Sequence, residues 1–164
     1  MGLDSHPGIM VVCHNQMTKK ISKYSLHESL GYLTYQASGA IRKHIGRELS
    51  RRGFPIKAEQ FAGLVYIWDE DGEPQRVLAE KLYRDKTTVT RLVTELESLG
   101  LIKRVPGQED GREKRIFLTE RGKKLMTEVT QLVQEILLLA QKGIDAREIK
   151  ICKDVLRRVR QNLG

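Results

Sequence analysis

The chain has 164 residues, of which 40% are hydrophobic, 30% are charged and 5% are aromatic. This length suits one domain with a sizeable core, and so few aromatic residues argue against a large β-sandwich or barrel. The formal net charge of +8 favours an anionic partner, although charge alone does not distinguish nucleic acid from a membrane surface.

Several classes of protein are excluded by what the sequence lacks. The two cysteines, Cys13 and Cys152, have no spacing typical of a disulfide framework or a zinc site. The apolar run Ile9–Cys13 is too short for a secretory signal, and no stretch is long enough to cross a membrane. No motif of a nucleotide-binding or hydrolytic enzyme occurs. We therefore expect a cytoplasmic protein that is not an enzyme, with no metal, no cofactor and no membrane partner.

The N-terminal half begins with a loose arm, residues 1–24, and continues into a long helix. "SLHE" at Ser25–Glu28 has the pattern of a capping box and predicts the helix start. Gly53 predicts its end, about 27 residues later. Its apolar residues recur every three or four positions and form one stripe: Leu26, Leu30, Leu33, Ala37, Ile41, Ile45 and Leu49. Such a stripe needs another long surface to cover it.

Three shorter helices follow. The first two are predicted at Lys57–Trp68 and Gln75–Tyr83, separated by an acidic turn. Arg84 and Asp85 then form a tight turn, and Asp85 is a good N-cap for a helix that stops at Gly100. The apolar residues of that helix predict its buried face: Val89, Leu92, Val93, Leu96 and Leu99.

Two short strands come next, at Leu101–Val105 and Lys114–Leu118, joined by a polar loop with two glycines, which predicts a two-stranded β-hairpin. Thr119 is then predicted to cap a long helix that extends to Gln141. A second capping box, "DARE" at Asp145–Glu148, begins the last helix. Its apolar residues are spaced by three and four: Ile149, Cys152, Leu156, Val159 and Leu163.

Two short helices across a tight turn, followed by a hairpin, are typical of a helix-turn-helix with a wing. The second helix of such a pair places its first turn in the major groove of DNA. Its polar residues can contact phosphates and base edges: Lys86, Thr87, Thr88, Thr90 and Arg91. In the hairpin loop, Asp110 and Arg112 flank Gly111, and an arginine there can enter a narrow minor groove. The alternatives are that the threonines only cap the helix and that both arginines are merely solvated.

At these residues the chain resembles the multiple antibiotic resistance regulator (MarR) family of bacterial winged-helix repressors. The similarity covers about Ser25 to the C-terminus and is carried by "LAEKLYRDKTTVTRLVTELESLGLIKR" and "EDGREKRIFLTERG". The resemblance implies a homodimer on a palindromic operator, with DNA contacts from the recognition-helix residues above and from Asp110 and Arg112. This chain has Gly111 where the family often has a basic residue. It has Gly31 where some members have a peroxide-sensing cysteine.

We therefore expect a mainly α fold with a small β-hairpin. A winged helix-turn-helix DNA-binding domain would occupy residues 54–118, and residues 25–53 and 119–164 would form a helical dimerisation region. The predicted function is that of a dimeric, sequence-specific transcriptional regulator, a repressor that a small phenolic effector releases from double-stranded DNA. One alternative is a winged-helix protein-interaction module without DNA binding. Another is a regulator that responds to oxidants through a cysteine.

Four aromatic residues are candidates for the effector site: Tyr32, Tyr35, Tyr66 and Trp68. The resemblance suggests them, because the family often binds small aromatic compounds between its dimerisation and DNA-binding parts. The alternative is that they are ordinary core residues. Cys13, in the N-terminal arm, is the candidate redox residue, whereas Cys152 lies on an apolar helix stripe and is expected to behave as a small hydrophobic residue.

Overall fold

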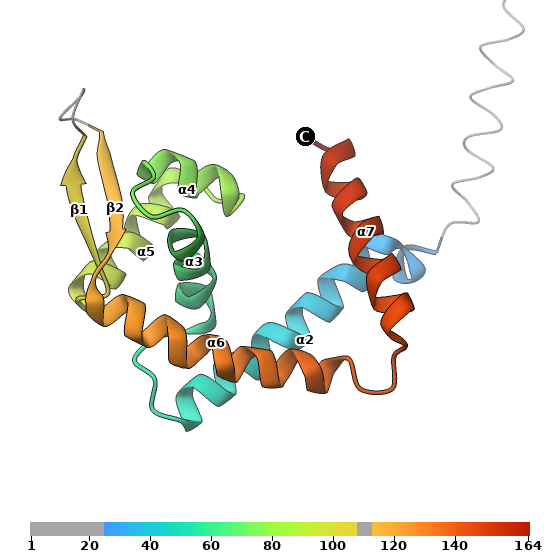
Figure 1. Ribbon diagram of the computed structural model, residues 1–164. Coiled ribbons are helices and arrows are strands. Elements are labelled where there is room, and N and C mark those ends of the chain that lie inside the picture. The colour runs from blue at the N-terminus through green and yellow to red at the C-terminus, as the bar shows by residue number, and fades with distance from the viewer. Residues whose placement is uncertain (1–24, 108–112) are drawn as a thin grey trace, which may run out of the picture. The chain divides into compact units, whose positions relative to one another are not determined.

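The computed structural model of the protein describes residues 25–107 and 113–164 (Figure 1). The elements are η1 (Leu26–Glu28), α2 (Leu30–Arg51), α3 (Ala58–Asp69), α4 (Gln75–Lys81), α5 (Lys86–Ser98), β1 (Ile102–Pro106), β2 (Lys114–Leu118), α6 (Glu120–Ala140) and α7 (Ala146–Asn162). The predicted fold class, mainly α with one β-hairpin, is confirmed. The described residues divide into two units between Ala40 and Ile41, an N-terminal unit that ends at Ala40 and a second unit that begins at Ile41. Within the described ranges, no helix has the length and apolarity needed to span a bilayer.

The first long helix starts later than the sequence pattern predicted. Ser25 makes no capping hydrogen bond with its side chain, and Leu26–Glu28 form a short 3-10 turn instead. The cap is Ser29, whose Oγ accepts a hydrogen bond from the Tyr32 amide at 3.2 Å. The prediction of a capping box at Ser25–Glu28 is therefore wrong, because the serine one residue beyond the box takes the capping role for α2.

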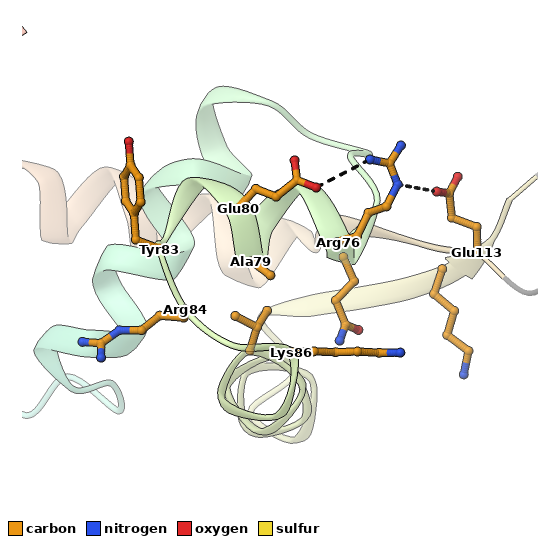
Figure 2. A pocket seen from close by; sticks show the side chains of 10 residues that line it. Arg76, Ala79, Glu80, Tyr83, Arg84, Lys86 and Glu113 are labelled. Atoms are coloured by element: carbon orange, nitrogen blue, oxygen red, sulfur yellow. Dashed lines mark hydrogen bonds and ion pairs between the residues drawn. The ribbon is translucent and has the colours of Figure 1, made fainter. Parts of the chain in front are cut away.

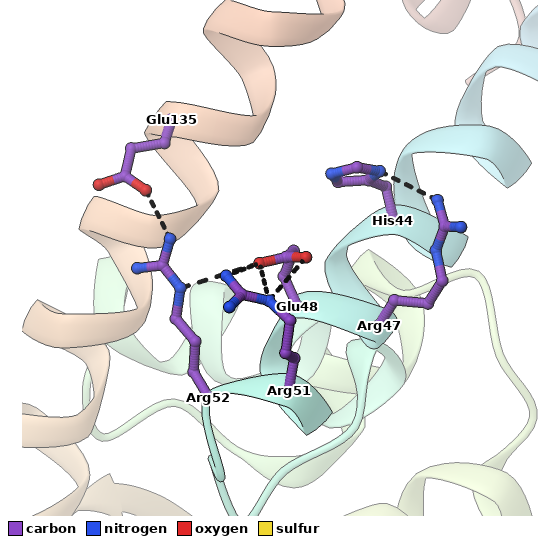
Figure 3. Close-up of polar contacts among 6 residues, drawn as sticks. All are labelled: His44, Arg47, Glu48, Arg51, Arg52 and Glu135. Carbon is purple, nitrogen blue, oxygen red and sulfur yellow. Dashed lines mark hydrogen bonds and ion pairs between the residues drawn. The ribbon is translucent and has the colours of Figure 1, made fainter.

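In the second unit, α2 ends as predicted and contacts α6. Gly53 has a φ of 73°, the left-handed conformation that favours glycine after a helix. Arg52 donates to Glu135 of α6 at 2.8 Å and lies 3.9 Å from Glu48, as Figure 3 shows. These ion pairs are exposed and contribute little energy, but they mark where the end of α2 and α6 lie side by side.

One continuous apolar core lies within the second unit. It combines side chains from α2, α3, α5, the hairpin and α6. The largest fully buried ones are Leu49, Leu64, Leu96, Leu101, Ile102, Ile116, Met126 and Leu132. Burial of each such side chain stabilises the fold by about 1.5–3 kcal/mol. The core therefore fixes α5 and the hairpin against α3 and α6, which is what an interface built on α5 requires.

The hairpin is held by a third segment that the sequence did not predict. β1 and β2 pair antiparallel, with Ile102 opposite Leu118. The acidic turn before α4 then pairs with β2: Gly72 N donates to Ile116 O at 2.8 Å, and Ile116 N donates to Glu73 O at 3.0 Å. The Asp71 carboxylate accepts from the Leu118 amide at 2.8 Å. The base of the hairpin is thus bonded on its β2 side as well.

The last two helices have the predicted caps. Thr119 Oγ1 accepts from the Gly122 amide at 3.0 Å and starts α6. Asp145 and Glu148 form the predicted capping box at the start of α7. In contrast with α6, no residue of α7 is buried. Ile151 and Leu163 on this helix are 62% and 84% exposed, so its apolar stripe is left uncovered by the described part of its own chain.

Candidate nucleic-acid interface

The turn between α4 and α5 sets the direction of the predicted recognition helix. Tyr83 in this turn has a φ of 50°, a left-handed conformation that non-glycine residues rarely adopt. Gln75, the first residue of α4, donates from Nε2 to Thr90 Oγ1 on α5 at 2.9 Å. The two helices are therefore linked on their polar side as well as through the core.

Asp85 caps α5 as predicted. Its carboxylate accepts from the Thr88 amide at 2.8 Å and from the Thr88 hydroxyl at 2.7 Å. The hydroxyl hydrogen bond, with the backbone hydrogen bond second, holds the pKa of Asp85 below its usual value. The ionised carboxylate at the N-terminus of α5 also interacts favourably with the positive end of the helix dipole. The first turn of α5 is therefore fixed before any partner binds.

The three threonines of α5 are not equivalent. Thr88 donates its hydroxyl hydrogen to Asp85, and Thr90 donates its own to the Lys86 carbonyl at 2.8 Å. Both hydroxyl oxygens can still accept hydrogen bonds, but neither is free to donate. Thr87 is exposed, and within the described residues its side chain makes no hydrogen bond. Thr87 is therefore the threonine whose hydroxyl remains available as a donor.

Two cations project from the same part of α5. Lys86 is exposed at its first position. The side chain of Arg91 is 77% exposed, and its Nε lies 3.9 Å from Glu95 Oε1, one turn along the helix. Figure 2 shows Lys86 extending from the first turn of α5, on the opposite side from Arg84. The predicted recognition residues Lys86, Thr87, Thr88, Thr90 and Arg91 thus all lie on the N-terminal half of α5.

A groove of about 610 Å³ lies between α4, the start of α5 and the start of β2. Its lining includes Gln75, Arg76, Tyr83, Arg84, Lys86 and Lys114, together with Glu80 and Glu113. Arg76 lies between these two carboxylates, 3.9 Å from Glu80 and 3.3 Å from Glu113 (Figure 2). The four cations outnumber the two acids, so the groove carries a positive charge beside the predicted recognition helix.

The sequence analysis did not assign this groove to the interface. Arg76 and Lys114 are 38 positions apart in the chain, and the pairing of β2 with the acidic turn brings them to one groove. The only sequence signal for them is the excess of basic residues in 75–125, which holds thirteen lysines and arginines against eight acidic residues. The unusual backbone of Tyr83 had no sequence signal, because a tyrosine in the left-handed region is not predictable from residue type.

The hairpin is joined rigidly to α5. Arg104 of β1 donates from its backbone amide to Glu97 Oε1 at 3.2 Å and from Nε to Oε2 at 2.9 Å. These hydrogen bonds, with the one from the side chain foremost, hold the pKa of Glu97 below its usual value. The predicted tip residues Asp110 and Arg112 lie outside the described residues. Where the structure does describe the hairpin, its two strands are fixed to the C-terminal end of α5.

The four candidate effector residues do not share one cavity lining. Tyr32 and Tyr35 belong to the N-terminal unit, where the Tyr32 hydroxyl accepts from Gln36 at 3.0 Å and Tyr35 is 70% exposed. Tyr66 lines a cleft of about 600 Å³ between α3 and α5, and Trp68 is not part of that lining. The cleft also includes Arg42, Lys57, Gln60, Arg84, Arg91 and Glu95.

The described ranges also bear on the expectations for metal ligands and cysteines. Within them, no group of three or more His, Cys, Asp or Glu side chains is placed to hold a metal ion. Cys152 is a free, exposed thiol on α7, although the sequence stripe suggested an apolar environment. Cys13, the candidate redox residue, lies outside the described residues.

Comparisons with known proteins agree with this geometry. Residues 56–114 match the family described as the MarR family. The chain is 30% identical over 135 residues to the organic hydroperoxide resistance transcriptional regulator of Bacillus subtilis (strain 168), an alignment that covers 82% of this chain and 90% of that protein.

Two solved structures of DNA complexes have similar folds. One is a mutant MarR from E. coli complexed with operator DNA, with a TM-score of 0.73 and 26% identity over 83% of this chain and 99% of that one. The other is the MepR–DNA complex of S. aureus, with a TM-score of 0.71 and 27% identity over 85% and 100% of the two chains.

Proposed function

Because this chain belongs to the MarR family of DNA-binding transcriptional regulators, we propose that it is a homodimeric repressor of a palindromic operator, released by a small phenolic effector. The family membership makes it a transcriptional regulator and not an enzyme. The observation that carries the proposal is the N-terminal half of α5, where a charged cap fixes the helix start and Lys86, Thr87 and Arg91 are exposed. Exposed cations at the start of this helix favour a DNA partner over a protein-interaction module without DNA binding.

The recognition residues divide by the hydrogen bonds that they have already made. Arg91 and Thr87 act as donors to base edges or phosphates, since Thr87 is free to donate and Arg91 is largely exposed. Thr88 and Thr90 act through their methyl groups or as acceptors, because their hydroxyl hydrogens are bound within α5 and its cap. Lys86 neutralises a phosphate, as a lysine at the start of the helix can.

Residues 54–118 form the DNA-binding domain of this proposal, with a wing that carries Asp110 and Arg112. Arg112 enters the minor groove, where narrow A·T-rich tracts attract cations. Support comes from the base of the hairpin, which Glu97 and Arg104 fix to α5. The described strands of the hairpin are thereby held against the C-terminal end of the recognition helix.

A second copy of the chain covers the apolar residues that remain exposed in residues 25–53 and 119–164. In the N-terminal unit, Leu26, Leu30 and Leu33 are between 46% and 72% exposed. At the other end, Leu138 and Leu163 are 71% and 84% exposed. Stripes of this kind on long helices are seldom left in water by soluble proteins. A two-fold dimer buries each stripe twice and also matches a palindromic operator.

The effector binds in the cleft between α3 and α5. Its volume of about 600 Å³ lies within the usual range for small-molecule sites. Tyr66 offers an aromatic surface there, and Arg42, Lys57 and Arg84 favour an anionic compound such as a phenolate or an aromatic acid. Because Arg91 lines the same cleft, an occupant could compete with DNA for this side chain.

The test separates the two kinds of DNA contact. The wild type, Arg91→Ala and Arg112→Ala are titrated at several salt concentrations against a duplex recovered by genome-wide mapping of bound sites, and against base-substituted versions of it. Arg91→Ala should cost about 1–3 kcal/mol and relax preference at one base pair per half-site. Arg112→Ala should weaken binding most where the flanks are A·T-rich and lower the salt slope by about two for a dimer.

Lys124→Ala is the matched control, because it removes one exposed positive charge from α6 outside the groove and the cleft. It should change affinity equally for all duplexes. If Arg91→Ala changes affinity no more selectively than Lys124→Ala, the assignment of α5 as the base-reading helix is wrong. If Arg112→Ala leaves the flank preference and salt slope unchanged, the hairpin is not a DNA-reading wing.

A further inference from the structure

A buried glutamine lies beside the recognition helix. Gln60 on α3 is 7% exposed. Among the described residues, it is the only buried residue with a polar or charged side chain. Both ends of its amide are used. Oε1 accepts from the Lys57 amide at 2.8 Å, and Nε2 donates to Glu95 Oε2 on α5 at 2.9 Å. The glutamine thus connects the start of α3 to the middle of the recognition helix.

The direction of this amide is not arbitrary. The Lys57 N–H, at the start of α3, has no acceptor within the helix backbone, and of the two ends of the Gln60 amide only the oxygen can accept from it. The amino group of Gln60 must then face Glu95. The two helices also touch closely one turn further along, since a Cβ on Gly63 would lie 2.8 Å from Leu92 Cδ2. This close approach keeps the backbones of α3 and α5 together at the level of the hydrogen bond from Gln60 to Glu95.

Glu95 in turn faces Arg91. Its second oxygen, Oε1, lies 3.9 Å from Arg91 Nε, one helical turn away. An exposed ion pair of this kind normally orients its partners weakly, because both side chains are mobile. Here one oxygen of the Glu95 carboxylate accepts a hydrogen bond from the buried Gln60, which restricts this side chain more than an isolated exposed glutamate and keeps its charge beside Arg91. The three residues form one connected line from the buried side of α3 to the exposed face of α5.

We propose that Gln60 and Glu95 are positioning residues that set the orientation of Arg91 and so determine specificity at the base pair that Arg91 reads. The inference rests on the proposed role of Arg91 in base reading. A guanidinium held in one direction loses less conformational freedom when it forms a paired contact with a base. Released from Glu95, the same guanidinium still attracts phosphates, so affinity for any DNA persists while discrimination falls.

Two single substitutions break the line at different points. Gln60→Glu keeps an oxygen for the Lys57 amide, so the start of α3 is retained, but it removes the donor to Glu95 and adds a like charge. Glu95→Gln keeps an acceptor for Gln60 but removes the charge that faces Arg91. The double variant combines both changes, so the new amide on α5 can donate to the new carboxylate on α3. The link between the helices is then restored, while Arg91 still faces a neutral group.

The measurement is binding to the bound-site duplex and to a set with each base pair substituted, together with thermal unfolding of each variant. Both single variants should lose about tenfold of the discrimination at the base pair that Arg91→Ala relaxes, and little elsewhere. The double variant should recover the thermal stability that Gln60→Glu loses, without recovering the discrimination. Gln131→Glu, the same change at an exposed site on α6, should alter neither.

The other outcomes separate this inference from the proposed function. If Arg91→Ala relaxes one base pair and both single variants keep full discrimination there, Gln60 and Glu95 do not position Arg91. A uniform loss of affinity for all duplexes, in step with lost thermal stability, would make Gln60 a purely structural residue and overturn the inference. If Arg91→Ala relaxes no base pair, the proposed role of Arg91 itself fails. Glu95→Gln alters an exposed side chain and provides the test if Gln60→Glu does not fold.

Discussion

At the scale of single residues, Gly122 shows how closely the hairpin and α6 approach each other. A Cβ built on Gly122 would lie 2.1 Å from the Leu101 carbonyl oxygen and 2.9 Å from Leu118 Cδ2. The first of these neighbours is backbone and cannot turn aside. The glycine in the "LTERG" motif is therefore required by a contact between segments that are distant in sequence.

Gly122→Ala should destabilise the protein by about 1–3 kcal/mol, because overpacking against backbone outweighs the better helix propensity of alanine. Gly46→Ala is the matched control. Its Cβ would meet Ala58 at an ordinary 3.8 Å, and it should stabilise the protein by about 0.5–1 kcal/mol. Urea unfolding of both variants measures the difference. Equal stabilisation by both would contradict the close approach of α6 to Leu101.

At the scale of elements, α5 depends on a charged cap. The pKa of Asp85 is lowered in the folded protein, first by the Thr88 hydroxyl and then by backbone hydrogen bonds. Folding therefore favours the ionised form. This contribution is fully present above the ordinary carboxyl pKa of about 3.9, and it is lost as the pH falls through the lower folded value.

Asp85→Asn tests this contribution, since asparagine keeps an oxygen for the Thr88 amide and is itself a good N-cap. The melting temperature of the wild type should fall more steeply than that of the variant as the pH is lowered from about 5 to 2. At neutral pH the variant should melt somewhat lower. Parallel melting curves over the whole pH range would mean that the charge on Asp85 does not stabilise α5.

The elements that could be predicted from sequence are those fixed by local hydrogen bonds. Asp85, Thr119 and Asp145 each accept from an amide two or three residues ahead, and each was recognised as a cap. Ser25 was wrongly predicted to be the cap of the first long helix. Ser29 can form the same kind of hydrogen bond, and the sequence pattern does not show which of the two serines caps the helix. The pairing of Glu73 with Ile116 was missed, because it joins segments 43 positions apart.

The candidate site likewise has some features that the sequence predicts and others that depend on tertiary packing. The residues of the recognition helix could be found from their type and order on one helix. The cleft and the link from Gln60 to Glu95 could not, because they depend on how α3 packs against α5, and the groove could not, because it depends on how α4 and β2 pack against α5. An alternation of polar and apolar residues indicates which face is buried, but not which polar side chain the packing will bury.

At the scale of the whole molecule, we predict that the exposed apolar residues of α7 lie in the dimer interface. Leu156→Lys places an ammonium group in the proposed interface and should weaken dimer formation by about a hundredfold or more. Gln161→Lys adds the same charge on an exposed part of α7 and should leave the dimer intact. Sedimentation at micromolar concentration measures both. A folded monomer of the unaltered protein would rule out the dimer, and with it the proposal that a second copy covers the apolar stripe of α7.

The proposed dimer and the proposed DNA contacts together determine how the operator must be arranged. A two-fold dimer presents two copies of α5, so the operator must contain two half-sites in inverted order, about one helical turn or a multiple of it apart. The groove and the cleft belong to each chain separately. Half-site spacing therefore reports on the dimer, whereas the preferred bases report on the N-terminal half of α5.

The most direct test is selection of bound duplexes from a pool of random sequence by the wild type and by Arg91→Ala. The account predicts that the wild type enriches one inverted repeat whose half-sites are spaced by about one helical turn or a multiple. Arg91→Ala should enrich the same repeat with preference lost at one base pair in each half. Enrichment of no common sequence by the wild type, or of identical sequences by both proteins, would contradict the account.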